Sequence, residues 1–244
     1  MADAKTRLPL AYVNIGIPGK DVGTVSDTAG NFALTIRGFM PSDTLRFSMV
    51  GYENQEVLLA DCGSGSNQFF MKENAVELAE LTIMAKGYKK RTFGNTAKSK
   101  FFGGKFSSED LGSELAIRIH AGRKKIQLKS FHFNISYNTE DTAVFRFNLY
   151  TVKDGSPDVN LLSENILIPI GSRQTGRISC DLSKHNIIIT DDFFIALEYI
   201  DGSKNSGIVF SAGFVNNPTY YRKASQSRWR KYPMGVGFSV LGEF

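Results

Sequence analysis

The chain has 244 residues, enough for one large domain or two of ordinary size. Hydrophobic residues make up 42% and charged residues 22%, which is typical of a folded protein. The formal net charge of +5 is too small to indicate nucleic-acid binding, and no run of about 18 apolar residues predicts a transmembrane segment. Nineteen Phe and nine Tyr against one Trp favour β structure.

The stretch from Leu8 to Val57 predicts a small antiparallel β-sandwich, because apolar residues alternate along three runs that Gly and Asp turns separate. Residues 27–31 (DTAGN) predict a tight hairpin turn, since Asp can bond the backbone two residues on and Gly30 tolerates a positive φ. Residues 67–71 and 76–83 predict two late strands, so the first domain is expected to span 1–84. The three runs are Ala11-Val13-Ile15-Ile17, Phe32-Leu34-Ile36 and Leu45-Phe47-Met49.

Residues 85–112 predict a basic, glycine-containing linker with no sustained period. A solvated connector is one interpretation. The other is an arm that contacts an anionic surface, such as lipid headgroups or acidic glycan, through Lys89, Lys90 and Arg91, which would allow peripheral membrane association. Four phenylalanines indicate that part of the segment packs against a neighbour: Phe93, Phe101, Phe102 and Phe106.

Residues 113–244 predict a second all-strand domain of about eight strands, which fits a jelly-roll-like β-sandwich. A shift in apolar parity predicts a bulge near Lys129 and Ser130. In the run 143–149, Arg146 and Asn148 lie on the face opposite the apolar residues. The predicted apolar runs lie at 115–119, 126–128, 131–137, 143–149, 166–168, 178–182, 193–199, 208–214 and 236–240.

Several ordered motifs of the first domain resemble the carboxypeptidase-regulatory-like domain, a transthyretin-like, Ig-like β-sandwich. They are residues 9–13 (PLAYV), 23–27 (GTVSD), 30–34 (GNFAL), 43–45 (DTL) and 51–53 (GYE), with Ser26 in place of the usual threonine. The resemblance is to the version in envelope and secreted proteins of Bacteroidota-type bacteria. It implies export to the periplasm, outer membrane or cell surface after removal of a signal peptide, which residues 1–5 (MADAK) do not form. It does not imply peptidase activity.

The second domain resembles jelly-roll adhesion and carbohydrate-binding-like modules of bacterial surface proteins, a resemblance that names no ligand. The motifs are residues 128–135 (LKSFHFNI), 145–150 (FRFNLY), 161–166 (LLSENI), 181–187 (DLSKHNI) and 192–200 (DFFIALEYI). The predicted fold class is therefore all-β, with two tandem β-sandwiches.

No catalytic constellation or cofactor site is predicted. His120, His132 and His185 lack metal-ligand spacing, and no G-x-S-x-G motif occurs. Cys62 and Cys180 allow either one bridge or two buried free thiols. Turn aspartates would allow a structural calcium if they converged: Asp154, Asp158, Asp191, Asp192 and Asp201.

The strongest candidate for a ligand surface gathers aromatic and basic residues near the C-terminus: Tyr220, Tyr221, Arg222, Trp229, Arg230 and Tyr232. Aromatic faces stack on sugar rings, and Arg forms forked hydrogen bonds to anionic groups. The alternative is that Trp229 closes the end of the sandwich. The chain is expected to be a non-enzymatic envelope protein that binds a protein partner or glycan, and not nucleic acid. The alternatives are a subunit of an outer-membrane secretion or nutrient-uptake assembly and a polysaccharide-acting hydrolase.

Overall fold

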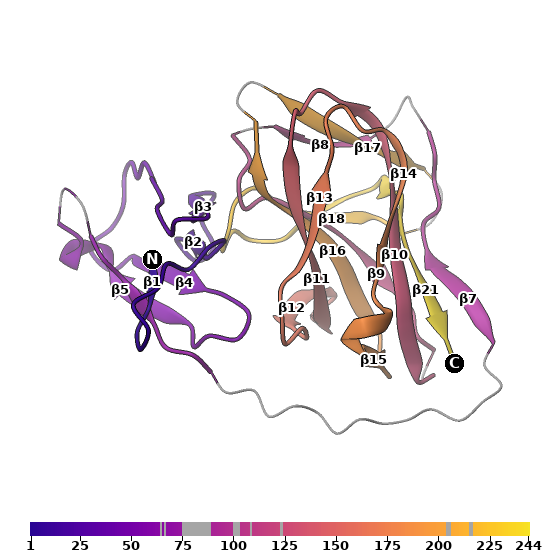
Figure 1. Ribbon diagram of the computed structural model, residues 1–244, viewed down its shortest axis with the longest axis horizontal. Helices are drawn as coiled ribbons and strands as arrows, with labels where there is room; N and C mark the ends of the chain where they lie inside the picture. Colours follow the sequence, from indigo (N-terminus) through magenta and orange to yellow (C-terminus); the bar gives the residue numbers. More distant parts are fainter. Residues whose placement is uncertain are drawn as a thin grey trace.

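The computed structural model describes residues 1–63, 65, 67–74, 89–99, 103–107, 109–122, 124–203, 206–214 and 217–244. Within these residues the chain folds into β-strands and two short 3-10 turns, η1 (Leu59–Asp61) and η2 (Ser183–His185). Figure 1 shows a smaller N-terminal domain on the left and a larger domain on the right. The predicted all-β fold class is confirmed.

The first domain contains two small sheets. Four antiparallel strands form the larger sheet in the order β3-β2-β4-β5, and β1 pairs with β6 in parallel. Val13, Ile15 and Phe47 are fully buried between them. The strands are β1 (Ala2–Asp3), β2 (Asn14–Gly16), β3 (Gly23–Val25), β4 (Thr44–Ser48), β5 (Gln55–Leu58) and β6 (Phe70–Met71).

The turn at 27–31 is confirmed, but the strand predicted after it is wrong. The Asp27 carboxylate accepts hydrogen bonds from the backbone N–H groups of Ala29 and Asn31, and Gly30 has a φ of 76°. Residues 32–39 form no backbone hydrogen bond with any described residue. Phe32, Leu34 and Ile36 still pack on the core. The apolar alternation therefore shows which side of the segment is buried, and it does not show that the segment pairs with another strand. The strand predicted at 76–83 lies outside the described residues.

The second domain is a sandwich of two larger sheets. Its strands are β7 (Lys90–Gly94), β8 (Gly103–Ser107), β9 (Glu114–Ile119), β10 (Ile126–Asn138), β11 (Ala143–Lys153), β12 (Ser156–Asn160), β13 (Ile166–Ile170), β14 (Gly176–Asp181), β15 (Ile188–Ile189), β16 (Phe193–Gly202), β17 (Gly207–Gly213), β18 (Thr219–Arg222), β19 (Arg230–Tyr232), β20 (Gly235–Val236) and β21 (Phe238–Glu243).

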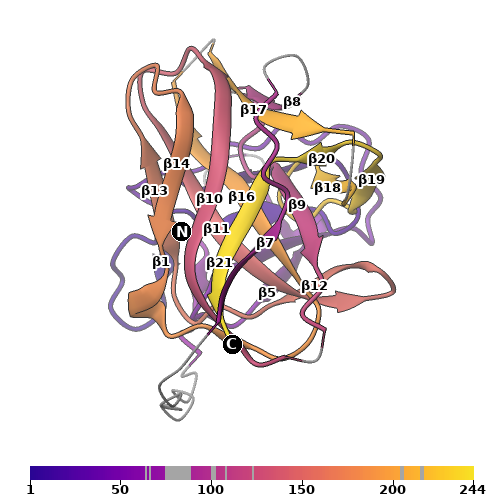
Figure 2. The same cartoon turned by 90° about the vertical axis from the view of Figure 1, so that its right-hand side faces the viewer.

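Strand β10 is the centre of one sheet, which we call the β10 sheet. It pairs with β14 and β15 along one edge and with β21 and β17 along the other. The other sheet, the β11 sheet, runs β12-β11-β16-β9-β18-β19, with β13 also paired to β11. The sheets face each other across an aromatic core that includes Phe131, Phe147, Phe210 and Phe238 (Figure 2). The predicted bulge is confirmed by a register shift between Leu128 and Ser130. The jelly-roll connectivity stays a prediction.

The described part of the predicted linker belongs to this sandwich. Residues 90–94 pair with β21 and residues 103–107 pair with β17, so the solvated connector is wrong for both segments. The physical reason is Phe93 and Phe106, whose side chains are buried in the core. Phe101 and Phe102 lie outside the described residues, as does the predicted domain end at residue 84.

Candidate functional site

A row of four charged residues crosses the outer face of the β11 sheet. Arg146 on β11 lies opposite Glu198 on β16, Glu198 lies opposite Glu114 on β9, and Glu114 lies opposite Arg222 on β18. Directly opposed residues have β carbons about 4.5–5.5 Å apart, so the strand register alone brings the four side chains together. The two carboxylates lie inside the row and the two arginines lie at its ends. We call this set the charged row.

Each carboxylate of the charged row has an arginine partner. Arg146 Nε donates to Glu198 Oε2 over 2.9 Å, and an Arg222 guanidinium nitrogen lies 2.7 Å from Glu114 Oε2. Asn148 Nδ2 donates to both carboxylates, over 2.8 and 2.9 Å, and therefore bridges two like charges. Both glutamates are fully buried, so neither charge is solvated by water at the surface.

Burial dominates the protonation of the charged row. Loss of hydration raises the pKa of Glu114, and the neighbouring Glu198 charge adds to this, while the Arg222 charge opposes it. Burial beside Glu114 also raises the pKa of the Tyr150 hydroxyl well above its ordinary value. That hydroxyl donates to Glu114 Oε1 over 3.0 Å. The row is thus a hydrogen-bonded network in which every charged group has an opposite partner, although Glu198 Oε1 and Arg222 Nε are buried without a hydrogen-bond partner among the described residues.

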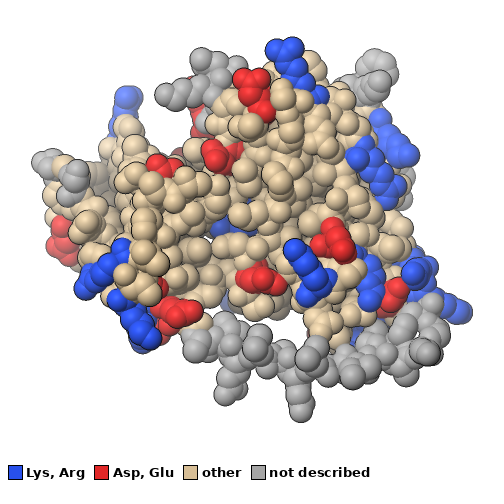
Figure 3. Space-filling view, viewed as in Figure 1, with Lys and Arg blue, Asp and Glu red and all other residues tan. Residues whose placement is uncertain are grey.

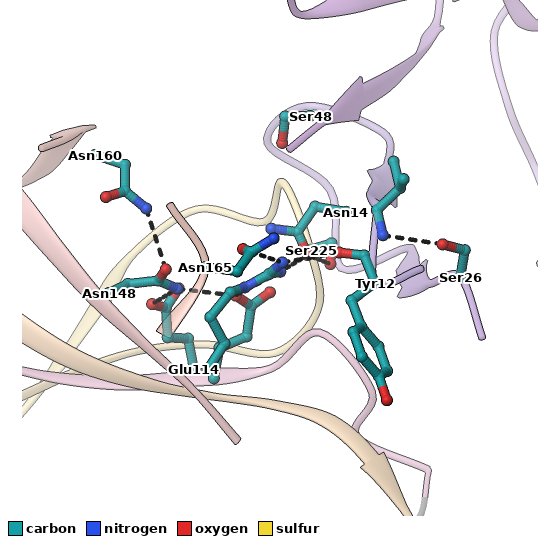
Figure 4. A network of polar contacts seen from close by, with 12 residues as sticks. Tyr12, Asn14, Ser26, Ser48, Glu114, Asn148, Asn160, Asn165 and Ser225 are labelled. Atoms are coloured by element: carbon teal, nitrogen blue, oxygen red, sulfur yellow. Dashed lines mark hydrogen bonds and ion pairs between the residues drawn. The ribbon is translucent and has the colours of Figure 1, made fainter. Parts of the chain in front are cut away.

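The first domain covers one end of the charged row. Arg146 donates to the backbone carbonyl of Tyr12 and to Asn14 Oδ1, each over 2.8 Å. Figure 4 shows Tyr12 and Asn14 from one segment and Ser225 from another converging on this point. Tyr12 has a φ of 62°, a conformation that few non-glycine residues adopt, and its carbonyl is fixed there by the arginine. The guanidinium therefore joins the two domains and the charged row.

The loop after β18 makes the second set of contacts between the domains (Figure 1). Ser225 Oγ lies 3.0 Å from Asn14 Oδ1, and Gln226 Nε2 donates to Ser48 Oγ over 2.7 Å. The backbone N–H of Gly19 donates to the Gln226 carbonyl over 2.9 Å. We call residues 223–229 the docking loop, because side-chain and backbone groups from this one segment bond the first domain.

Two glycines allow the docking loop to approach the first domain. A β carbon at Gly16 on β2 or at Gly23 on β3 would overlap the carbonyl oxygen of Ser225. Gly112 has a φ of 81°, and a β carbon there would overlap the hydroxyl oxygen of Ser225. The close contact of Ser225 with the β2-β3 hairpin therefore depends on the absence of side chains at these positions.

The predicted ligand surface lies mostly inside this junction. Arg222 binds Glu114, and Arg230 pairs with Asp21 of the first domain over 2.8 Å. Trp229 packs edge-on against Tyr150 with ring centroids 5.8 Å apart, and the Arg222 guanidinium lies 5.1 Å from the Trp229 ring. These contacts favour the alternative interpretation, in which Trp229 covers the sheet.

The remaining members of that predicted surface are divided between packing and solvent. Tyr220 packs edge-on against Phe194 at 4.8 Å, and Tyr221 packs against the main core. Tyr232 is 52% exposed and is the member of the set most open to a partner.

The basic residues proposed to contact an anionic surface lie along β7, which is at the right of Figure 1 and on the side of Figure 3 where several Lys and Arg side chains appear. Lys90 lies 3.2 Å from Glu243, and the Arg91 guanidinium lies 5.2 Å from the Phe93 ring. The Lys89 backbone exchanges two hydrogen bonds with Phe244. The structure thus gives each of the three a contact within the second domain.

No group of three or more His, Cys, Asp or Glu side chains among the described residues could hold a metal ion. The Asp192 carboxylate, one of the five calcium candidates, is already bonded to Arg118 and His120, over 2.9 and 2.7 Å. His185 lies 2.5 Å from Glu164. Both cysteines are free thiols and half-buried, and burial raises the pKa of each.

Sequence reasoning missed the centre of the site. Glu114 and Glu198 are not among the predicted site residues, and Arg146 and Asn148 are predicted only to face outward. The signal in the sequence is a charged residue on the outward face of a strand whose other outward residues are apolar, as Phe194 and Ala196 are on β16. Such a pattern is typical of a sheet face covered by another domain.

The charged row resembles a hydrolase site only in its paired carboxylates. Retaining glycosidases place two carboxyl groups about 5 Å apart beside an open cleft. Here both carboxylates are fully buried, and each is neutralised by an arginine. The arrangement can hold two domains in one orientation, and it offers no exposed oxygen to a substrate.

The fold and the site together define the N-terminal part as a small Ig-like β-sandwich docked on a larger sandwich. Residues 1–83 match the sequence model of the CarboxypepD_reg-like domain, so this part of the chain is a CarboxypepD_reg-like domain, whose Ig-like fold is non-catalytic. Comparison with curated proteins found no match, and comparison with solved structures found none. Among the described residues, no helix is long and apolar enough to span a membrane.

Proposed function

We propose that the protein is a non-enzymatic scaffold or binding protein of the bacterial cell envelope. It would be exported and would engage a protein partner or a glycan through its β-sandwich surfaces. The observation that supports this most directly is the junction between the domains. There Arg146 donates to one backbone carbonyl and one side-chain oxygen of the first domain, and it also pairs with buried Glu198.

A fixed junction suits a scaffold for a physical reason. Separating the domains would remove the hydrogen bonds that the buried Arg146 guanidinium donates to Tyr12 and Asn14, as well as the Arg230–Asp21 pair, so these contacts favour one orientation. Surfaces on both domains are then presented to a partner at a constant spacing, and less conformational freedom is lost on binding. The first domain would act as a rigid docking module and the second would carry the recognition surface.

The proposal is tested by affinity capture from envelope extract of a Bacteroidota-type bacterium. The bait is the whole chain, alongside Tyr232→Ala and, as a matched control, Tyr137→Ala, which removes an equally exposed tyrosine from the β10 sheet. We expect retention of a stoichiometric protein or of polysaccharide, reduced by Tyr232→Ala and unchanged by Tyr137→Ala. Release of reducing sugar from polysaccharides by the purified chain would overturn the proposal in favour of the hydrolase.

One observation favours a second candidate, a subunit of an outer-membrane secretion or nutrient-uptake assembly. Residues 32–39 offer unpaired backbone groups along a hollow of about 790 Å³, lined by apolar side chains that include Phe32, Leu45, Leu59 and Phe69. An extended protein segment adds to such an edge through main-chain hydrogen bonds and apolar pockets. Protection of amides 32–39 from hydrogen exchange after addition of a captured partner would support this candidate.

A further inference from the structure

The outer face of the β10 sheet carries a small polar hollow that no part of the junction uses. Its floor includes His132 and Asn134 from β10, Arg177 from β14 and Ser239 from β21, and Lys98 lies in its wall. Its volume is about 20 Å³ by the measure that gives 790 Å³ for the hollow of the first domain, enough for about one water-sized group. Two cationic side chains, an imidazole and a serine hydroxyl therefore border one space the size of a small polar group.

The wall of the polar hollow is a fixed part of the fold. Asn95 Nδ2 donates to the Gly235 carbonyl and its backbone N–H donates to the Phe238 carbonyl, both over 2.7 Å. The Asn95 carboxamide oxygen in turn accepts from the backbone N–H of Ala97 over 3.0 Å. A β carbon at Gly237 would lie 2.5 Å from the Ala97 carbonyl oxygen, so this glycine lets the segment rest on the sheet. The wall is thereby held over β21.

His132 has one ring nitrogen that the protein leaves unsatisfied. Its Nε2 lies 2.9 Å from Ser130 Oγ, whereas Nδ1 is buried and finds no hydrogen-bond partner among the described residues. An unpaired buried polar atom is unfavourable unless a ligand or water completes it. His132 is one of the residues that line the hollow, so a ligand bound there lies beside the imidazole ring.

The charges around the hollow favour an anion as that group. Arg177 and Lys98 are exposed, and neither forms an ion pair with a described carboxylate. Glu243, the acidic residue on β21, is bonded to Lys129 and Lys90, each over 3.2 Å. Burial lowers the pKa of His132, and the Arg177 charge lowers it further.

We propose that the polar hollow is a binding site for a single oxyanion group, the carboxylate, sulfate or phosphate of a small ligand. The Arg177 guanidinium supplies the forked donors that suit such groups, and Lys98 supplies a second positive charge. The imidazole of His132 lies beside the bound group. The site does not depend on the scaffold role, because it involves none of the junction residues.

The test is a titration of the full chain with sodium phosphate, sodium sulfate and sodium acetate at constant ionic strength, with sodium chloride as the reference. Binding is followed by calorimetry and by the ring nitrogen resonances of His132. We expect one saturable site, with a change in the ring nitrogen resonances of His132. The ranking of phosphate, sulfate and acetate distinguishes the three sources of the oxyanion.

Two variants keep the proposal falsifiable. Arg177→Gln should weaken binding about tenfold or more, since it removes a charge-assisted hydrogen bond. Arg37→Gln is the matched control, because Arg37 is an exposed arginine on the first domain, and it should leave the affinity unchanged. If Arg177→Gln fails to fold, Lys98→Gln in the exposed wall replaces it. The proposal would be overturned if Arg177→Gln, or its replacement Lys98→Gln, bound the anion with the same affinity as Arg37→Gln. It would also be overturned if the His132 resonances did not respond.

Discussion

Replacing Arg146 with Met should destabilise the domain junction more than any change of a surface charge. Met keeps most of the side-chain volume but removes the guanidinium. Glu198 would then be buried with only Asn148 as a donor, next to a second buried carboxylate, Glu114. The Tyr12 carbonyl would also lose its donor across the junction, and Asn14 Oδ1 would keep only Ser225 Oγ.

The size of the effect follows from the burial of the pair. Removing one partner of a buried ion pair costs about 3–5 kcal/mol, because the other charge stays in a poorly hydrated site. The exposed pair of Arg46 and Glu56 provides the comparison, since such pairs contribute about 0–1 kcal/mol. With a urea m-value of about 2–3 kcal/mol per M, Arg146→Met should lower the unfolding midpoint by about 1–2 M.

Trp229 is the only tryptophan and lies at the junction, so its fluorescence reports the relevant transition directly. Urea unfolding is measured by fluorescence and by far-ultraviolet circular dichroism for the wild type, Arg146→Met and Arg46→Met. A second arm combines Arg146→Met with Glu198→Leu, which should recover much of the loss because no unpaired charge stays buried. Equal midpoints for Arg146→Met and Arg46→Met would refute the reasoning.

Three further predictions concern the junction and the thiols. Gly16→Ala should destabilise docking by about 1–3 kcal/mol through overlap with the docking loop, while Gly63→Ala, which meets no atom within 4 Å, should be neutral in the same urea assay. The hydrogen bond from Arg230 lowers the pKa of Asp21 below its ordinary value of 3.8, so the unfolded chain binds the proton more readily. The stabilisation lost in Asp21→Asn should therefore be present at neutral pH and disappear as the pH falls below 3.8; a difference that persists there would contradict this. Both thiols should react slowly with iodoacetamide at pH 8 until urea unfolds the chain, because burial raises their pKa values; fast labelling of the native protein would exclude this.

The sequence predicted most of the longer strands of the second sandwich, because their apolar residues alternate with a period of two, but it missed β7, β8, β12, β15, β18 and β19. Leu115, Ile117 and Ile119 face the core as expected, and the parity change near Ser130 corresponds to the register shift on β10. Apolar alternation is a local property, so it can be read without knowing which strands are neighbours. The charged row is a property of register across four strands, which the order of residues does not contain.

The same limit explains the errors in the first domain and the linker. Phe32, Leu34 and Ile36 alternate and are packed on the core, yet their backbone has no described partner. Conversely, Lys90 and Arg91 suggested a solvated connector, although the neighbouring Phe93 is buried and the segment pairs with β21. In both cases side-chain chemistry was interpreted correctly, and the missing information was the location of other backbone segments.

The docking loop is synthesised long after the first domain that it contacts. Ser225 lies 211 residues from its partner Asn14, and β10 pairs with β21 at the end of the chain. During synthesis the first domain emerges from the ribosome long before the surface on which it docks exists. Until the last strands appear, the outward face of β11 with Arg146 and Asn148 must stay exposed to water or to a chaperone. A chain that ends before residue 225 would contain Arg146 but lack the docking loop, so it could form only part of the junction.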